Sequence, residues 1–407
     1  MTGMRGANSL LQAVAQRGAL IGGLVLTTVL LLLFIRHWPF EPFLASDYYA
    51  FNAWSDRLLN AGFDYGEAFR RLGLPERLYT VPLTVMALLK LLFGELWRDV
   101  YVWLNMLWTA LTLFAICSAA RMLKVSWLAI AAVLPLVLLS ADFMFWPQYV
   151  LTDTLFAFLL MAMVWWVVFV LTRVHPSRVQ RVFFILVALL LLGLVLLGRP
   201  TSPTYVLAFV AFVLAVGVGV DRIRPRSLAV GIAGLIGLLA LGYGVLISVY
   251  VNTDWISRSR ELSFIARFAI EGLVVYDRPD TAIQHTGRWL DYAWLFIVRF
   301  LTFWSPYAST FSLEHLIANF TVKLAFLGAF VAWVVSGHWL DRPQSRAALL
   351  VVLIALAGSA FHATMFVDFD WRYRFPVIAP MLLLTMLMLD LVVRRWAETG
   401  LRRASAG

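Results

Sequence analysis

Long runs of apolar residues separated by short polar segments dominate this chain. A helix needs about 20 apolar residues to cross the hydrocarbon layer of a bilayer, with a working range of about 17 to 25. Ten runs approach or reach that length, so the pattern predicts an all-α polytopic membrane protein with about ten transmembrane helices. The predicted spans are residues 18–35, 101–120, 126–141, 154–172, 183–198, 203–220, 228–251, 320–340, 347–366 and 375–393.

Two further apolar stretches are poor candidates for spanning helices. Residues 79–93 are short and contain Lys90, and residues 292–312 contain Arg299 together with Ser305-Pro306. We predict an interfacial helix at 79–93 and an interfacial or re-entrant helix at 292–312. They belong to two long outer segments, 36–100 and 252–319. The pattern indicates no soluble domain, so residues 1–407 are interpreted as a single membrane domain.

Composition and charge support a membrane protein and exclude several other classes. The chain is 62% hydrophobic and 14% charged, whereas soluble domains average about half apolar and about a quarter charged. The net charge of +10 does not indicate nucleic-acid binding, because the basic residues are spread over short gaps between apolar runs. The single cysteine, Cys117, excludes an intramolecular disulfide and a cysteine metal cluster.

The distribution of basic residues predicts the orientation. With ten spans, the inward segments carry 16 of the 33 Lys and Arg residues and four acidic residues, whereas the outward segments carry 17 basic and 19 acidic residues. Basic residues in short loops favour the cytoplasmic side, so both termini are predicted to be cytoplasmic. Residues 18–35 are interpreted as a retained span, because no small-x-small cleavage site precedes Arg36.

Two carboxylates, Asp47 and Asp153, lie at membrane boundaries that this threading places on the same outer side. A carboxylate there is costly unless it is hydrated, paired or used, so the two residues indicate a reaction centre at the outer surface. The alternative is structural, since each residue precedes or begins a helical run and is suited to capping it.

Arginines at the outer ends of spans are candidate phosphate contacts, because a guanidinium offers a fork of donors to phosphate oxygens. Arg199 lies in Gly198-Arg-Pro-Thr-Ser-Pro203, and Arg372 and Arg374 lie in the dense block 366–376. Arg199 is equally well explained as an arginine that snorkels to the interface, and the block as a salt-bridged cap. The histidines show no metal-ligand spacing.

Four features in order resemble the GT-C superfamily of integral-membrane glycosyltransferases, and particularly the protein O-mannosyltransferase and lipid A aminoarabinose transferase group. An early acid follows the first span in Ser46-Asp-Tyr-Tyr49, and an interfacial segment ends in Leu92-Phe-Gly94. A second acid opens a later span in Leu151-Thr-Asp-Thr-Leu-Phe156, and Arg372-Tyr-Arg-Phe-Pro376 precedes the last span. The chain departs from the family pattern at Tyr48, which replaces a second acid, and at Val81-Pro82, which replaces a Pro-Pro pair.

The resemblance implies a GT-C-type helical membrane domain that transfers a sugar from a polyprenyl-phosphate donor to a lipid, glycan or protein acceptor at the outer face of the plasma membrane. Transfer would be inverting, with Asp47 as general base. Asp153 would orient the acceptor or, with Asp47, help hold a divalent cation, as in some members of the group. Arg199, Arg372 and Arg374, with Arg299 as a weaker candidate, would stabilise the departing phosphate.

Two other functions fit parts of the pattern. A lipid-linked glycan ligase or polymerase would depend on the outer residues Arg258, Arg260 or His285 rather than on Asp47. A flippase or transporter of lipid-linked sugar would carry ionisable residues deep in its spans, and such residues are scarce in this chain.

Overall fold

The computed structural model describes residues 41–70, 72–173, 177–220, 223–252, 269–270, 272, 282–283, 287–307, 312–364 and 371–406. Within these ranges the fold is all-α, and the β pairing there is a single isolated bridge between Phe43 and Tyr149. The longer helices are α2 (Ser46–Asn60), α5 (Thr80–Phe93), α6 (Trp97–Met122), α10 (Asp153–Leu171), α11 (Arg178–Leu196), α12 (Ser202–Gly217), α13 (Pro225–Asn252), α15 (Trp289–Thr302), α16 (Leu313–Ser336), α17 (Arg342–Thr364) and α18 (Phe375–Ala406). The short elements are α3 (Tyr65–Ala68), α4 (Leu74–Arg77), η1 (Gly94–Leu96), α7 (Trp127–Val133), α8 (Pro135–Leu139), α9 (Ala141–Phe145), η2 (Trp146–Gln148), η6 (Gly337–Trp339) and η7 (Trp371–Arg374).

Seven helical segments in the described ranges are long and apolar enough to cross a membrane, which confirms a polytopic membrane protein. They are Thr80–Met122, Asp153–Leu171, Arg178–Leu196, Pro225–Val249, Leu313–Trp339, Arg342–Thr364 and Phe375–Thr399. Two shorter apolar segments, Trp127–Leu139 and Ser202–Gly217, coincide with two further predicted spans. The predicted span 18–35 lies outside the described residues.

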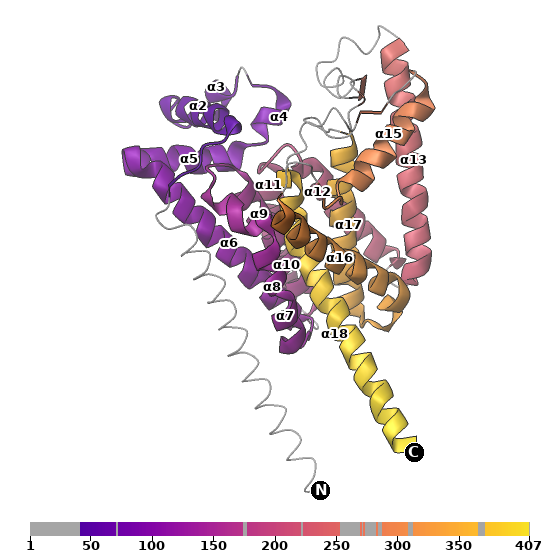
Figure 1. Cartoon of the computed structure of the whole chain (residues 1–407). Coiled ribbons are helices and arrows are strands. Elements are labelled where there is room, and N and C mark those ends of the chain that lie inside the picture. Colours follow the sequence, from indigo (N-terminus) through magenta and orange to yellow (C-terminus); the bar gives the residue numbers. More distant parts are fainter. Residues whose placement is uncertain are drawn as a thin grey trace, which may run out of the picture.

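Helices at the periphery expose apolar side chains, as expected for contact with lipid. On α11, Val179 is 79% exposed and Leu190 is 63% exposed, whereas on α18 most residues from Phe375 to Leu391 are buried. Large contiguous apolar surfaces are unusual on soluble proteins. The exposed faces of α11 and α13 are therefore suited to contact with lipid, and α18 is central to the bundle (Figure 1).

The predicted span 126–141 is not one continuous helix. It is divided at Pro135, which lacks the backbone N–H that an uninterrupted helix would use, and again at Ser140. The Ser126 side chain caps the first piece, α7, by accepting a hydrogen bond of 3.3 Å from the backbone N–H of Ala129. The predicted span therefore forms the series α7, α8 and α9, with Pro135 at the first break and Ser140 at the second.

The predicted interfacial helix 79–93 corresponds to α5, which is separated from α6 by η1. Gly94 adopts a φ of +53° at this break, a conformation that suits glycine. In Figure 1, α5 lies with α2, α3 and α4 at one end of the molecule, and α6 runs away from them towards α7. The second doubtful stretch, predicted as 292–312, overlaps α15. This helix begins three residues before the predicted stretch, at Trp289, and ends at Thr302, before Ser305-Pro306.

Lys90 on α5 is accommodated because all three of its ammonium hydrogens have acceptors on or beside α2. Its Nζ lies 2.9 Å from the backbone oxygen of Asn52, 2.7 Å from Ser55 Oγ and 2.6 Å from Asp56 Oδ1. The Lys90 side chain is 8% exposed. A buried ammonium that is fully hydrogen-bonded joins the two helices rather than destabilising them.

Three of the segments that the charge pattern places on the inner side lie together at one end of the bundle. Gln344 Nε2 donates to the backbone oxygen of Leu123 at 2.8 Å, and the backbone N–H of Ser126 donates to Asp390 Oδ1 at 3.0 Å. Asp390 also forms an ion pair of 2.7 Å with Arg394. The α6–α7 turn, the start of α17 and the end of α18 therefore lie together, as the threading requires.

Candidate functional site

The segments that carry Asp47 and Asp153 are held side by side by backbone hydrogen bonds. The Phe43 N–H donates to the Gln148 oxygen at 3.0 Å, and the Val150 N–H donates to the Phe43 oxygen at 3.1 Å, forming a parallel bridge between Phe43 and Tyr149. Each aspartate lies four residues beyond its bridged residue and in the first turn of a helix, α2 or α10. The structure thus places the two predicted carboxylate segments at the same end of the bundle.

Two side chains of α6 fix the segment that leads to Asp153. Asn105 Nδ2 donates to the backbone oxygen of Tyr149 at 2.7 Å, and the Tyr101 hydroxyl donates to the backbone oxygen of Leu151 at 2.9 Å. Both residues are fully buried. Because this segment is not helical, its carbonyls need other partners, and the two buried side chains supply hydrogen bonds that water would supply at a surface.

Asp153 forms a buried ion pair with Arg199. Arg199 Nη1 donates to Asp153 Oδ1, and the two residues are 3% and 2% exposed. The guanidinium also lies 4.9 Å from the centre of the Tyr373 ring. The snorkelling alternative for Arg199 is therefore wrong, because its side chain is directed into the protein and paired there. The N-cap of α10 is Thr152, without a side-chain capping bond.

Tyr79 lies within the electrostatic reach of both carboxylates. It precedes α5, whose first turn is tied to the end of α11 by a 2.9 Å hydrogen bond from the Val81 N–H to the Leu197 oxygen. Burial raises the pKa of Tyr79; the charge of Arg199 opposes this, and Tyr373, Asp153 and Asp47 add to it. Tyr79 is therefore a neutral phenol among these groups.

Asp47 is partly exposed, in contrast to Asp153. The N-cap of α2 is Ala45, which makes no side-chain capping bond, and Asp47 lies inside the first turn, where the positive end of the helix dipole favours a carboxylate. The following residue, Tyr48, is buried and stacks on Trp97, with ring centres 6.2 Å apart. Asp47 therefore stands at the edge of a packed aromatic cluster.

An exposed arginine on α6, Arg98, adjoins this aromatic cluster. Its guanidinium lies 5.5 Å from the centre of the Tyr48 ring and 5.8 Å from that of Trp97. Burial raises the pKa of the Tyr48 hydroxyl, and the charge and hydrogen bond of Arg98 partly oppose the rise. Arg98 therefore lies beside the Asp47 segment, on the same helix as Tyr101, whose hydroxyl bonds to the Asp153 segment.

Sequence reasoning missed both Tyr79 and Arg98. A single tyrosine beside an apolar run is indistinguishable in sequence from an interfacial anchor. For Arg98 the sequence offers one indication, because Trp97-Arg98 follows the predicted interfacial helix within a few residues.

In the described residues, Arg374 lies against the end of α15 and Arg299 lies within α15. Arg374 donates to the backbone oxygens of Ser305 at 2.6 Å and Thr302 at 2.9 Å, which satisfies carbonyls left without partners at the end of α15. Arg299 is fully buried in α15, and its backbone oxygen lies 3.0 Å from His362 Nδ1. Its guanidinium lies near the Tyr243 hydroxyl. The side chain of Arg372 lies outside the described part of the structure.

The described residues do not fit a divalent-cation site. They contain no group of three or more His, Cys, Asp or Glu side chains placed to hold a metal ion. Asp153, one of the two carboxylates considered for such a site, is bonded to Arg199. The Arg199 guanidinium thus occupies the position beside Asp153 that a metal cation would take.

Comparisons with protein-family models, with curated proteins and with solved structures found no match. The class of protein is therefore defined by the fold and the candidate site alone. It is an all-α polytopic membrane protein with a buried Asp–Arg pair and a partly exposed carboxylate at one end of its helix bundle.

Proposed function

We propose that the protein is a membrane glycosyltransferase that moves a sugar from a polyprenyl-phosphate donor to an acceptor hydroxyl or amine at the outer face of the plasma membrane. The observation that carries the proposal is the convergence of Asp47 with the Asp153–Arg199 pair through the Phe43–Tyr149 bridge. The bridge places the segment of a partly exposed carboxylate beside the segment that carries the buried ion pair, which offers a base and an anion-stabilising group at one end of the bundle.

Asp47 is the proposed general base. In an inverting transfer, the acceptor oxygen or nitrogen attacks the anomeric carbon while the bond from that carbon to the phosphate oxygen breaks. The acceptor proton passes to Asp47, and polyprenyl phosphate leaves with the bonding electrons. A base must be within hydrogen-bond reach of the acceptor, and the partial exposure of Asp47 allows an acceptor to approach it.

Arg199 is the proposed contact for the departing phosphate, and Asp153 is the residue that positions Arg199. A guanidinium held by a buried carboxylate and an aromatic ring is preorganised, so little reorganisation is needed when negative charge develops on the leaving group. This changes the role expected for Asp153 from contact with the acceptor to support of the cation. The exposed Arg98 offers a second cation at the edge of the site.

The membrane-spanning helices suit a donor with a long apolar tail. The candidate site lies at one end of the bundle, as a phosphate group at the headgroup level of the bilayer requires, while the apolar faces of the spans contact the region where the tail lies. A transporter of the same lipid would need ionisable groups near the midplane. In the described residues, the Asp153–Arg199 pair lies at helix ends instead.

The test is sugar transfer in membranes that contain the protein and a panel of labelled polyprenyl-phosphate sugars. We expect a covalent glycosylated product with the wild type and a loss of at least about 100-fold with Asp47→Asn, the range typical of a missing general base. Glu95→Gln is the matched control, because Glu95 is an exposed acid at the same end of the bundle and its loss should leave the rate unchanged.

Two results would overturn the proposal. An unchanged rate in Asp47→Asn would remove Asp47 as the base and favour a ligase that depends on Arg258, Arg260 or His285, which lie outside the described residues. Absence of a covalent product with every donor, in membranes where lipid-linked sugar still crosses the bilayer, would favour a transporter.

A further inference from the structure

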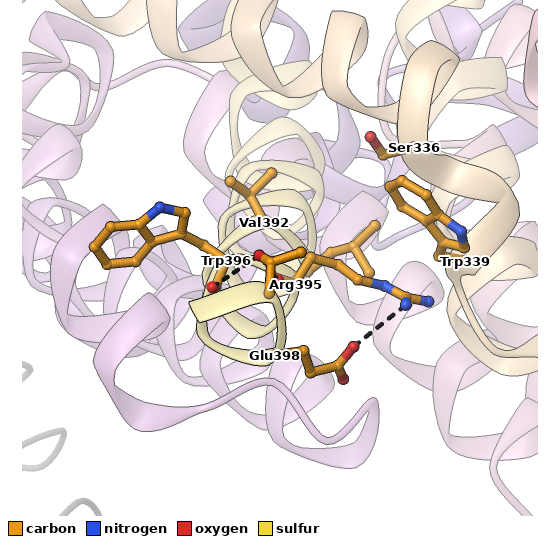
Figure 2. A pocket seen from close by; sticks show the side chains of 8 residues that line it. Ser336, Trp339, Val392, Arg395, Trp396 and Glu398 are labelled. Atoms are coloured by element: carbon orange, nitrogen blue, oxygen red, sulfur yellow. Dashed lines mark hydrogen bonds and ion pairs between the residues drawn. The ribbon is translucent and has the colours of Figure 1, made fainter. Parts of the chain in front are cut away.

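A hollow of about 400 Å³ lies at the end of the bundle opposite Asp47 and Asp153, between the end of α16 and the C-terminal half of α18. Ser336 and Trp339 border it on one side, and Arg395, Trp396, Glu398 and Thr399 border it on the other. Figure 2 shows Arg395 and Glu398 between the two indole rings, with Trp339 on the far side of Arg395 from Trp396. The hollow therefore combines two opposite charges with two aromatic walls.

The two charges are within reach of each other and of solvent. Arg395 Nη1 lies 3.3 Å from Glu398 Oε2, and the two side chains are 43% and 55% exposed. The guanidinium also lies 4.7 Å from the centre of the Trp339 ring. An exposed ion pair of this kind contributes little to stability, so a ligand with matching charges can separate the pair at low cost.

The hollow lies near the end of the part of α18 that is apolar enough to span a membrane. Val392 is 48% exposed and Trp396, one turn further along, is 80% exposed. The apolar segment of α18 that is able to span a membrane ends at Thr399. Tryptophans and arginines concentrate at the headgroup level of membranes, so a lipid headgroup is the ligand nearest to this site and the one present at the highest concentration.

We propose that this hollow binds the headgroup of a zwitterionic aminophospholipid. Arg395 binds the phosphate, Glu398 accepts hydrogen bonds from the primary ammonium, and an acyl chain lies along Val392 and Trp396. The two titratable side chains that border the hollow carry one positive and one negative charge, which match the phosphate and the ammonium of a zwitterionic headgroup. A quaternary ammonium has no N–H to donate to Glu398, which favours ethanolamine over choline.

Such a lipid would connect α16 to α18 at this end of the bundle. Helix α18 starts at Phe375, directly after η7, whose Tyr373 contacts Arg199 of the candidate site. A lipid bound in the hollow would therefore stabilise α18, the helix that follows the Tyr373 contact with Arg199 at the opposite end of the bundle. The inference does not depend on the proposed sugar transfer.

The test is native mass spectrometry of the purified full-length protein after exchange into phosphatidylethanolamine, phosphatidylglycerol or phosphatidylcholine with identical acyl chains. We expect the wild type to retain phosphatidylethanolamine with about a tenfold preference over both other lipids, equivalent to about 1.4 kcal/mol. Arg395→Gln and Glu398→Gln should each lose that preference. Arg178→Gln is the matched control, an exposed arginine at the start of α11, and should keep it.

Glu398→Asp separates loss of binding from loss of folding, because it keeps the carboxylate and should keep most of the preference. Equal retention of the three lipids by the wild type would overturn the proposal. A preference for phosphatidylglycerol, or a preference for phosphatidylethanolamine that survives in both glutamine variants, would also overturn it.

Discussion

The two ends of the helix bundle use the same kinds of charged residue in different ways. At the end with Asp47, the Asp153–Arg199 pair is closed off from solvent, with both side chains less than 5% exposed. At the opposite end, Arg394 is 48% exposed beside the buried Asp390, and Arg395 and Glu398 are both exposed. A charge that is buried must be paired, whereas a charge at the headgroup level is hydrated. The comparison indicates that the burial of both partners of an ion pair, rather than the presence of charge, distinguishes the candidate site.

The largest expected effect is at the buried pair. Asp153→Asn and Arg199→Gln should each destabilise the protein by about 3–5 kcal/mol, because each leaves an uncompensated charge in the interior. Denaturation of the purified protein in micelles measures this loss. The double variant should recover part of it, and the comparison between the two ends would fail if either single variant changed stability by less than about 1 kcal/mol.

The second effect is expected at Lys90, which joins α2 to α5. Lys90→Met keeps the length of the side chain but removes three hydrogen bonds, so we expect a loss of about 2 kcal/mol. Asp56→Asn is the matched control, because Asp56 is 47% exposed and an amide oxygen still accepts from Lys90. A Lys90→Met variant as stable as Asp56→Asn would show that the ammonium does not hold α2 in place.

A smaller effect is expected at the opposite end, where Asp390 accepts a hydrogen bond from the Ser126 N–H and pairs with Arg394. Asp390→Ala should cost about 1–2 kcal/mol, comparable to the loss of a helix cap. Sugar transfer should be unaffected once the protein is folded. A loss of transfer equal to that of Asp47→Asn would place this end in the reaction and erase the difference between the two ends.

The smallest effect is expected at the exposed pair. Arg395→Gln in detergent without added lipid should change stability by no more than about 0.5 kcal/mol, because exposed ion pairs contribute little. The same denaturation measurement checks this value. A loss above about 2 kcal/mol would mean that the pair behaves as a buried one.

The sequence pattern predicted the fold class and much of the helix placement. The interfacial helix predicted at 79–93 begins at Thr80 and ends at Phe93, because a short apolar run bounded by Gly94 has clear limits. The run 126–141 was predicted as one helix because a count of apolar residues ignores Pro135, which divides it. The adjacency of the Asp47 and Asp153 segments was predicted from the threading alone, which assigns both to outer span ends.

The partners of the arginines were beyond sequence reasoning. Arg199 pairs with a carboxylate 46 positions earlier in the chain, and Arg374 donates to carbonyls about 70 positions earlier. Both pairings depend on how the helices pack, and nothing in the local sequence distinguishes an arginine that binds a carboxylate from one that caps a helix. The same limit applies to Tyr79, whose significance comes from its neighbours in space.

The central claim is that the segments carrying Asp47 and Asp153 meet at one end of the bundle, and cross-linking tests it most directly. Cys117 is buried, so a Phe43→Cys/Tyr149→Cys double variant adds the only accessible thiols in the described residues. The bridge between these positions predicts that mild oxidation forms an intramolecular disulfide, detected by mass spectrometry of the digested protein. The control variant Phe43→Cys/Trp396→Cys, with its thiols at opposite ends, should form none. Absence of a disulfide in the first variant, or equal yields in both, would contradict the account.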